Sequence, residues 1–226
     1  DWSYEESAGP ENWGKLAASN AVCAQGSEQS PINIVSSQVI EDKKIGGKQI
    51  NYMPTTFTLH NNGHTIQANA ITEKNRIVVE GKEYKLAQFH FHTPSEHQLN
   101  GQYYDLEIHF VHKDESGNLA VLGVMIQEGR ENETLEVIWN SLPKEASEKE
   151  VSRKYLIHLQ ALLPQNQMAY HYDGSLTTPP CTEEVRWIVF EQPIEMSKEQ
   201  IKAFQQIYTN NHRPVQPLNE REIIKE

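Results

Sequence analysis

The chain has 226 residues, of which 31 are acidic and 20 are basic, and its formal net charge is -11 at pH 7. This charge argues against a nucleic acid as the natural partner, because a phosphate backbone repels an acidic protein. No apolar run approaches the roughly 18 residues of a membrane span, and the start DWSYEE lacks the basic and apolar regions of a signal peptide. We therefore expect a soluble chain with no membrane span, from which a signal peptide has already been removed.

The organisation of the chain favours a single domain over residues 1–226. It contains no repeat, no low-complexity tract and no linker rich in Pro, Gly or Ser, and 37% of its residues are hydrophobic, which suffices for one sizeable core.

Strand patterns dominate the middle of the chain. Residues 57–69 predict two strands around an Asn-Asn-Gly turn, residues 76–92 predict two more around Glu80-Gly81-Lys82, and residues 103–127 repeat the form. Consecutive hairpins predict a mostly antiparallel sheet whose faces are covered by helices and loops.

Helical periodicity appears in three later segments, residues 133–142, 149–163 and 197–208. In the last of these, Ser197 and Gln200 form a capping-box pattern. We expect few helices, all at the periphery.

The segment QFHFHTPSEH, residues 88–97, places two histidines one residue apart on a predicted strand. Because side chains alternate between the faces of a strand, Gln88, His90 and His92 share one face and the two phenylalanines share the other. Each imidazole must find a hydrogen-bond partner, remain in water or bind a metal. A His-x-His strand alone does not decide among these, and hydrogen-bonded histidines on a half-exposed strand are the commoner case.

A third histidine, His109, lies on the strand predicted within residues 103–112. By the same two-residue period, Glu107 and Val111 share its face. Two neighbouring antiparallel strands would then offer three imidazoles on a common face, which leaves the fourth position of a tetrahedral zinc site open for water. Gln88 and Glu107 have the parity to orient two of the histidines through their second ring nitrogens.

Other histidines and loops are less specific. His112 points the other way by parity, and we interpret it, His97 and His158 as structural or surface histidines. LTTPPC, residues 176–181, predicts a Pro-stiffened turn, and HNNGH, residues 60–64, predicts a hairpin turn with an imidazole.

The two cysteines, Cys23 and Cys181, permit one disulfide, which would imply an oxidising compartment. Their number fits two buried free thiols in a cytosolic protein equally well.

Taken together, several segments resemble the α-class carbonic anhydrases over nearly the whole chain. They occur in the family's order and spacing, and the HTPSEH form with the two cysteines is similar to the bacterial secreted branch. The resemblance implies an α+β, mainly β fold, with one domain built on a large, twisted, mostly antiparallel central sheet and peripheral helices. The segments are QFHFH, SEH, DLEIHFVH, NNGH, QSPINI, GPENW, VLGV, SLTTPPC, VRWIVF and HRPVQPLN.

The resemblance implies a zinc ion, Zn2+, held by His90, His92 and His109, with a bound hydroxide that attacks carbon dioxide to give bicarbonate. It also implies that Thr177 accepts the hydrogen bond of this hydroxide and donates its own proton to an ionised Glu96. Ester hydrolysis would be a secondary activity of the same hydroxide.

For proton transfer, the resemblance implies that His64 is the shuttle, with Tyr4, Asn62 and Gln67 around the water chain. Gln67 and the neighbouring Thr65 depart from residues common in relatives, which leaves the orientation of the shuttle open. The residues of the apolar substrate pocket would be Val111, Val121, Leu176, Thr178, Val185 and Trp187, although the sequence alone fits ordinary core residues equally well.

Further implications concern partners and location. The resemblance implies carbon dioxide and bicarbonate as ligands, sulfonamide and anion inhibitors at the zinc, a bond between Cys23 and Cys181, a periplasmic or secreted location, and a monomer or homodimer.

Two alternatives from other classes remain at this stage. HFHTPSE matches part of the metal cupin motif, in which Glu96 would itself be a ligand, but Tyr84 and Tyr103 stand where that motif has glycines. A binding module on the carbonic anhydrase fold would have lost a zinc ligand, whereas all three histidines are present here.

Overall fold

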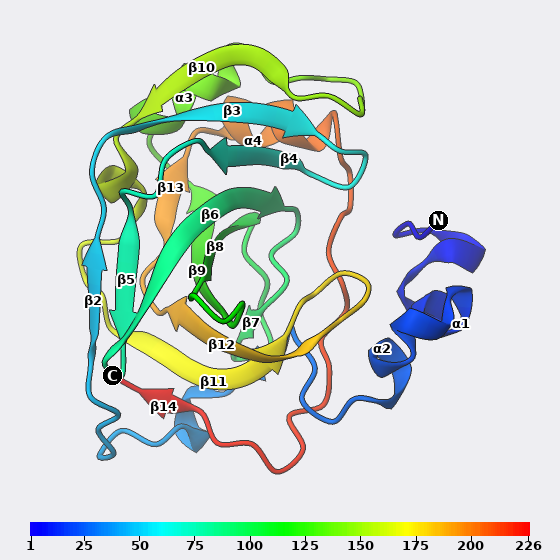
Figure 1. Ribbon diagram of the computed structural model, residues 1–226, viewed down its shortest axis with the longest axis vertical. Coiled ribbons are helices and arrows are strands. Elements are labelled where there is room, and N and C mark those ends of the chain that lie inside the picture. The colour runs from blue at the N-terminus through cyan, green and yellow to red at the C-terminus, as the bar shows by residue number, and fades with distance from the viewer.

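The computed structural model describes residues 1–226, except for the side chain of Ser152. Most of the described strands form one 12-stranded sheet in the order β10-β3-β4-β6-β8-β9-β12-β11-β14, with β5 on β6, β2 on β5 and β13 on β9 (Figure 1). The strands are β1 Asn33–Ile34, β2 Lys48–Asn51, β3 Thr55–Asn61, β4 Ile66–Ala70, β5 Arg76–Val79, β6 Lys82–His92, β7 Gln98–Leu99, β8 Leu106–Lys113, β9 Leu119–Glu128, β10 Val151–Ile157, β11 Ala169–Ser175, β12 Glu183–Phe190, β13 Ile194–Met196 and β14 Ile224–Lys225.

The sheet is mostly antiparallel, as predicted. Among the pairings of the described strands in this sheet, those of β12 and β13 with β9 are parallel and the others are antiparallel. Figure 1 shows that the sheet curls strongly, so that β3 and β4 lie at one end and β11 and β12 at the other. The curl makes one face concave, and this face carries the site described below.

Few helices accompany the sheet, and they lie at its periphery (Figure 1). None of those in the described residues is long and apolar enough to cross a membrane. The four α-helices are α1 Trp13–Leu16, α2 Val22–Gln25, α3 Glu133–Trp139 and α4 Lys198–Gln205, and five short 3-10 helices accompany them among the described residues.

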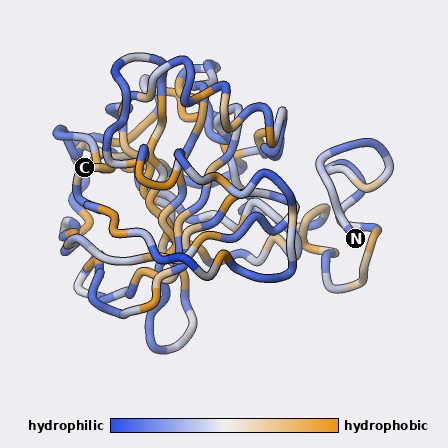
Figure 2. The backbone as a smooth tube through the Cα atoms, turned by 90° about the horizontal axis from the view of Figure 1, so that it is seen from above, coloured by the Kyte–Doolittle hydropathy of each residue, from blue (hydrophilic) through white to orange (hydrophobic). Residues whose placement is uncertain are grey.

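One face of the central strands is packed with aromatic side chains. Phe89, Phe91 and Phe110 are fully buried. The Phe91 ring meets Trp139 of α3 edge-on at 5.0 Å between centroids and lies 5.9 Å from Phe204 of α4. Figure 2 shows that hydrophobic segments lie mainly inside the molecule and hydrophilic loops mainly outside. Because α3 and α4 cover this face, the alternate residues of β6 and β8 are free to build a polar site on the other face.

The predicted hairpins are confirmed. Residues 57–69 form β3 and β4, residues 76–92 form β5 and β6, and residues 103–127 hold β8 and most of β9.

Two of the three predicted helices are confirmed as α3 and α4. Ser197 caps α4, and the full capping box forms because the Ser197 hydroxyl accepts from the backbone N–H of Gln200 while the Gln200 side chain accepts from the backbone N–H of Ser197.

The helix predicted over residues 149–163 is wrong. The segment forms the strand β10, followed by a 3-10 helix from Leu159 to Leu162. Tyr155 and Ile157 are buried whereas Leu156 between them is 50% exposed, which is the alternation of a strand. Pairing with β3 overrides the apparent helical spacing of the leucines, because β3 would otherwise be a bare edge of the sheet.

The N-terminal segment is tied to the rest of the molecule by a disulfide between Cys23 of α2 and Cys181, whose Cα atoms are 5.1 Å apart. The predicted pairing is thus confirmed. It anchors the N-terminal segment beside the loop that follows β11, which carries Thr177 and Thr178. Trp13, fully buried, packs with both cysteines.

Candidate active site

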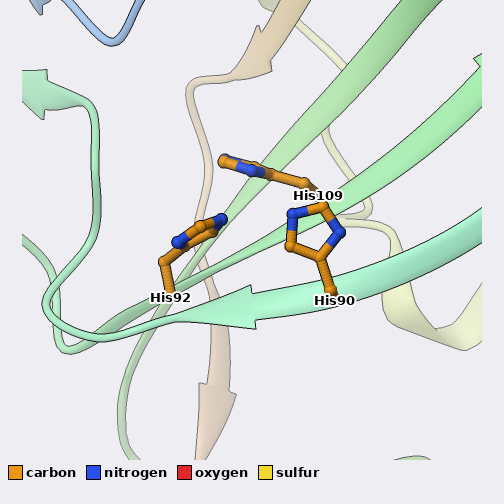
Figure 3. A group of neighbouring side chains, drawn as sticks. All are labelled: His90, His92 and His109. Atoms are coloured by element: carbon orange, nitrogen blue, oxygen red, sulfur yellow. The ribbon is translucent and has the colours of Figure 1, made fainter. Parts of the chain in front are cut away.

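Three histidines converge on the concave face of the sheet (Figure 3). β6 and β8 are antiparallel neighbours whose register sets His90 directly opposite His109, and His92 follows two residues along β6. One ring nitrogen of each lies within 4.8 Å of the others. The two-residue period and this register together explain why residues 17 or more positions apart meet.

The outer nitrogen of each imidazole is held by an oxygen of the surrounding protein. The three pairs are His90 Nδ1 with Gln88 Oε1 at 2.8 Å, His92 Nδ1 with the Asn211 carbonyl oxygen at 2.7 Å, and His109 Nε2 with Glu107 Oε2 at 2.6 Å. Since all three oxygens can only accept, each ring donates outward and keeps an unprotonated nitrogen for the centre.

The inner nitrogens fit a metal ion. His92 Nε2 is buried and has no hydrogen-bond partner among the described residues. Burial, reinforced by the other imidazoles, holds the pKa of His90 well below its ordinary value, and burial lowers the pKa of His92 to about 4. Three neutral imidazoles with free lone pairs are the ligand set of catalytic zinc sites.

Glu107 is a fully satisfied buried carboxylate behind the histidines. It accepts from the backbone N–H groups of Glu96 and His97 at 2.9 and 2.8 Å, and from the rings of His97 and His109 at 2.8 and 2.6 Å. Burial alone would raise the pKa of Glu107, but the two histidines hold it well below its usual range. An ionised Glu107 therefore fixes the tautomer of His109 with Nδ1 toward the centre.

His97 extends this arrangement away from the centre. Its Nδ1 donates to Glu107, so its Nε2 accepts from the Tyr172 hydroxyl at 2.6 Å. His97, Glu107 and His109 also cluster like metal ligands, but hydrogen bonds among these residues already use the clustered atoms. His97 is fully buried, which fits the structural one of the two roles, structural or surface, expected for it.

Glu96 and Thr177 lie beside the histidines. Glu96 is fully buried, its Oε2 accepts from the backbone N–H of Arg213 at 2.8 Å, and its Oε1 lies 3.3 Å from His92 Nε2. Burial raises the pKa of Glu96, while His109 and the Thr177 hydroxyl act to lower it. Oε1 is buried and has no hydrogen-bond partner among the described residues.

The site opens into a cavity of about 150 Å³. Most of the residues predicted for the site line it, but Glu96 and Glu107 lie behind the wall. Val185, predicted for the substrate pocket, does not line it and instead packs in the core with Val121 and Trp187. The lining residues are Trp2, Tyr4, Asn62, His64, Thr65, Gln67, Gln88, His90, His92, His109, Val111, Val121, Leu176, Thr177, Thr178 and Trp187.

His64 lies at the cavity wall with its ring stacked on Trp2, at 3.6 Å between centroids and 11° between planes. Burial lowers the pKa of His64. Asn62 shapes its turn by accepting from the backbone N–H groups of His64 and Thr65. The Tyr4 hydroxyl is buried without a partner among the described residues.

Sequence reasoning missed several contributors. The Trp2 ring stacks on His64. The Asn211 carbonyl oxygen accepts from His92, and the Arg213 backbone N–H donates to Glu96. Gly123 lies opposite His109 on β9, where an added Cβ would be 3.0 Å from Glu107 Oε2. In the sequence, the glycine in VLGV was the one signal that Glu107 lies close to this backbone.

The twisted sheet carries a cluster of three histidines that could hold a single metal ion. The family model of eukaryotic-type carbonic anhydrases matches residues 8–226, and the chain belongs to this family of lyases. A carbonic anhydrase from Nostoc is 40% identical over 228 residues, which cover 100% of this chain and 86% of the relative. The predicted family, enzyme class and fold are thereby confirmed, and the cupin alternative fails.

Solved structures agree. An α-carbonic anhydrase from Thermovibrio ammonificans, in complex with the inhibitor sulfanilamide, has a TM-score of 0.94 and 44% identity over 99% of this chain and 98% of that one. A hyperthermostable carbonic anhydrase from a hydrothermal vent chimney has a TM-score of 0.93 and 45% identity over 100% and 99% of the two chains.

Proposed function

We propose that the protein catalyses the reversible hydration of carbon dioxide to bicarbonate and a proton, with zinc held by His90, His92 and His109. The observation that carries this proposal is that all three imidazoles donate outward, while no hydrogen bond of the described residues uses their inner nitrogens. When bound, zinc would supply a Lewis acid that lowers the pKa of a bound water to about 7, as it does in carbonic anhydrases.

Thr177 and Glu96 would orient the attacking oxygen. Glu96 Oε2 is used by the backbone N–H of Arg213, and its buried Oε1 is free for the Thr177 hydroxyl. A hydroxyl that gives its proton to a carboxylate keeps its oxygen as an acceptor, so Thr177 would select a nucleophile that donates to it. This aims the lone pair of the nucleophile at the carbon of the substrate.

The substrate would lie against the apolar part of the cavity wall, formed by Val111, Val121, Leu176 and Trp187, with Thr178 beside it. Carbon dioxide has no net charge and accepts hydrogen bonds only weakly, so an apolar wall suits it better than a polar one.

His64 would carry the product proton from the cavity to buffer, with Tyr4, Asn62 and Gln67 around the intervening water. Because burial lowers the pKa of His64, its imidazole is neutral at neutral pH and able to accept a proton. The His64→Ala variant should turn over more slowly in dilute buffer, with kcat/KM unchanged, and free imidazole should restore its turnover. Equal turnover of parent and variant at all buffer concentrations would reject the shuttle.

The test of the activity is a metal analysis and a carbon dioxide hydration assay on one sample. We expect about one zinc ion per chain and hydration that is lost on chelation and regained with zinc. Zinc at one per chain without hydration would instead favour the binding module on the same fold.

The remaining expectations are proposals of the same kind. Sulfonamides and anions would bind at the zinc, ester hydrolysis would be a secondary activity, and residues 1–226 would act as one domain. The disulfide supports an oxidising compartment, periplasmic or extracellular. A monomer or homodimer is expected.

A further inference from the structure

A line of hydrogen bonds starts at Gln67 in the cavity wall, runs across β4 and β3, and ends at an exposed carboxylate, Glu150. Thr58 Oγ1 donates to Glu150 Oε2 at 2.5 Å, and Asn69 Nδ2 donates to Glu150 Oε1 at 3.1 Å. Gln67 Nε2 in turn donates to Asn69 Oδ1 at 2.7 Å. Thr58 and Asn69 are directly paired residues of β3 and β4, so the sheet itself brings both donors to one carboxylate.

The carboxylate sets the direction of the whole line. An ionised carboxylate can only accept, so Asn69 must turn its NH2 group toward Glu150 and its carbonyl oxygen toward Gln67. Gln67 must then donate with its own NH2 group. Reversing either amide would set two acceptors or two donors against each other. The Gln67 carbonyl oxygen is left over, and no hydrogen bond within the described residues uses it.

Gln67 lines the same cavity as the three histidines and His64. It is directly paired with His90 on the neighbouring strand. Asn62, also on this wall, accepts from two backbone N–H groups with its side-chain oxygen, and no hydrogen bond of the described residues uses its NH2 group. Gln67 is therefore the amide here that can offer an acceptor.

We propose that Glu150, acting through Asn69, is a positioning residue that presents the Gln67 carbonyl oxygen to the water molecules carrying protons to His64. The kinetic meaning of this inference rests on the proposed hydration reaction and shuttle. A water that has taken up a proton becomes a donor of three hydrogen bonds, so an acceptor in the wall stabilises it and an NH2 group disfavours it. Glu150, Asn69 and Gln67 neither gain nor lose a proton; the proton passes from water to water and then to His64.

Amide orientation can be measured without any assay of activity. The Glu150→Gln variant replaces the obligate acceptor with a group that can also donate, which permits both amides to reverse. By NMR of the zinc-loaded protein, the Gln67 side-chain NH2 should exchange with solvent roughly fivefold faster in the variant, as expected on losing one neutral hydrogen bond. Glu148→Gln is the matched control, because Glu148 is an exposed glutamate of the same segment with the same charge. It should leave this exchange as in the parent.

Hydration kinetics test the consequence. The buffer should be too bulky to enter the cavity of about 150 Å³. At saturating buffer, Glu150→Gln should lower kcat roughly fivefold and leave kcat/KM near the parent value, because only proton transfer is affected. Gln67→Leu should have a similar effect, and adding Glu150→Gln to it should cost nothing further.

Three results would overturn the inference: parent-like exchange of the Gln67 amide in Glu150→Gln, an unchanged kcat, or a further loss on the Gln67→Leu background. A parent protein without hydration activity would instead overturn the proposed function. The amide exchange would still decide whether Glu150 orients Gln67.

Discussion

His109 and His112 lie three residues apart on β8, both are buried, and they belong to opposite faces of the sheet. The ring of His112 is closed off: Nε2 pairs with the Tyr52 hydroxyl at 2.6 Å and Nδ1 donates to the Ala120 carbonyl oxygen at 3.0 Å. Among the described residues, the ring of His109 is hydrogen-bonded on one side alone, to Glu107. Burial therefore does not distinguish a structural histidine from a functional one; the count of partners around the ring does.

The largest expected contrast is in metal binding. His109→Ala should lose both zinc and hydration activity, because two imidazoles do not make the three-ligand site. His112→Gln should keep about one zinc per chain and lose only stability, by about 1 to 3 kcal/mol for the disturbed hydrogen bonds. Metal analysis and urea unfolding of both variants provide the check. Zinc loss in His112→Gln, with the fold intact, would contradict the distinction between the two faces.

A second prediction concerns the cavity that His109 lines. It distinguishes residues that hold the metal from Thr177, which would orient the nucleophile. Thr177→Ala should keep its zinc and lose hydration by on the order of 10² to 10³, the typical effect of removing one aimed hydrogen bond from a catalytic site. Stopped-flow hydration and metal analysis on the same sample measure both. A Thr177→Ala variant that hydrates carbon dioxide at the parent rate would refute the role given to Thr177 and Glu96.

The closed ring of His112 also predicts a pH effect on stability. Burial lowers the pKa of His112 to about 4 in the folded protein, against about 6.5 in an unfolded chain. As the pH falls from 6.5 toward 4, the unfolded chain takes up a proton that the folded protein does not, so the free energy of unfolding falls by about 3 kcal/mol. In His112→Gln this part of the fall should vanish. Urea unfolding at pH 7.5 and pH 4 should show it, and equal pH dependence in parent and variant would count against it.

The smallest expected effect concerns the partner of His109. Glu107→Gln turns an acceptor of four hydrogen bonds into a group that must also donate, which weakens its hold on the ring. Zinc affinity should fall by roughly 10- to 100-fold, as for other outer partners of metal ligands. Competition with a chelator measures this, with the exposed Glu115→Gln as the charge-matched control. Unchanged affinity would mean that the charge of Glu107 is not needed.

The sequence specified local features of the molecule well. Alternation along β6 and β8 placed Gln88, His90, His92, Glu107 and His109 on one face, and the capping box at Ser197 marked the start of α4. These features repeat every two residues or span one turn, so neighbouring side chains suffice to define them. The same kind of pattern misled over residues 149–163, where Leu156 lies in an edge strand and Leu159 and Leu162 lie in a 3-10 helix. The pairing of this strand with β3 depends on a distant part of the chain, so the segment alone does not reveal it.

Tertiary structure alone decided which imidazole nitrogens stay free and which residues surround His64. The Asn211 carbonyl oxygen that holds His92 comes from 119 residues further along the chain, and Trp2, which stacks on His64, comes from the N-terminal segment secured by the disulfide. Glu150 is likewise separated by 81 residues from Asn69. By itself, the sequence determined the residue types and the faces they occupy; only packing decided their partners, because a hydrogen bond between distant segments depends on the arrangement of every element between them.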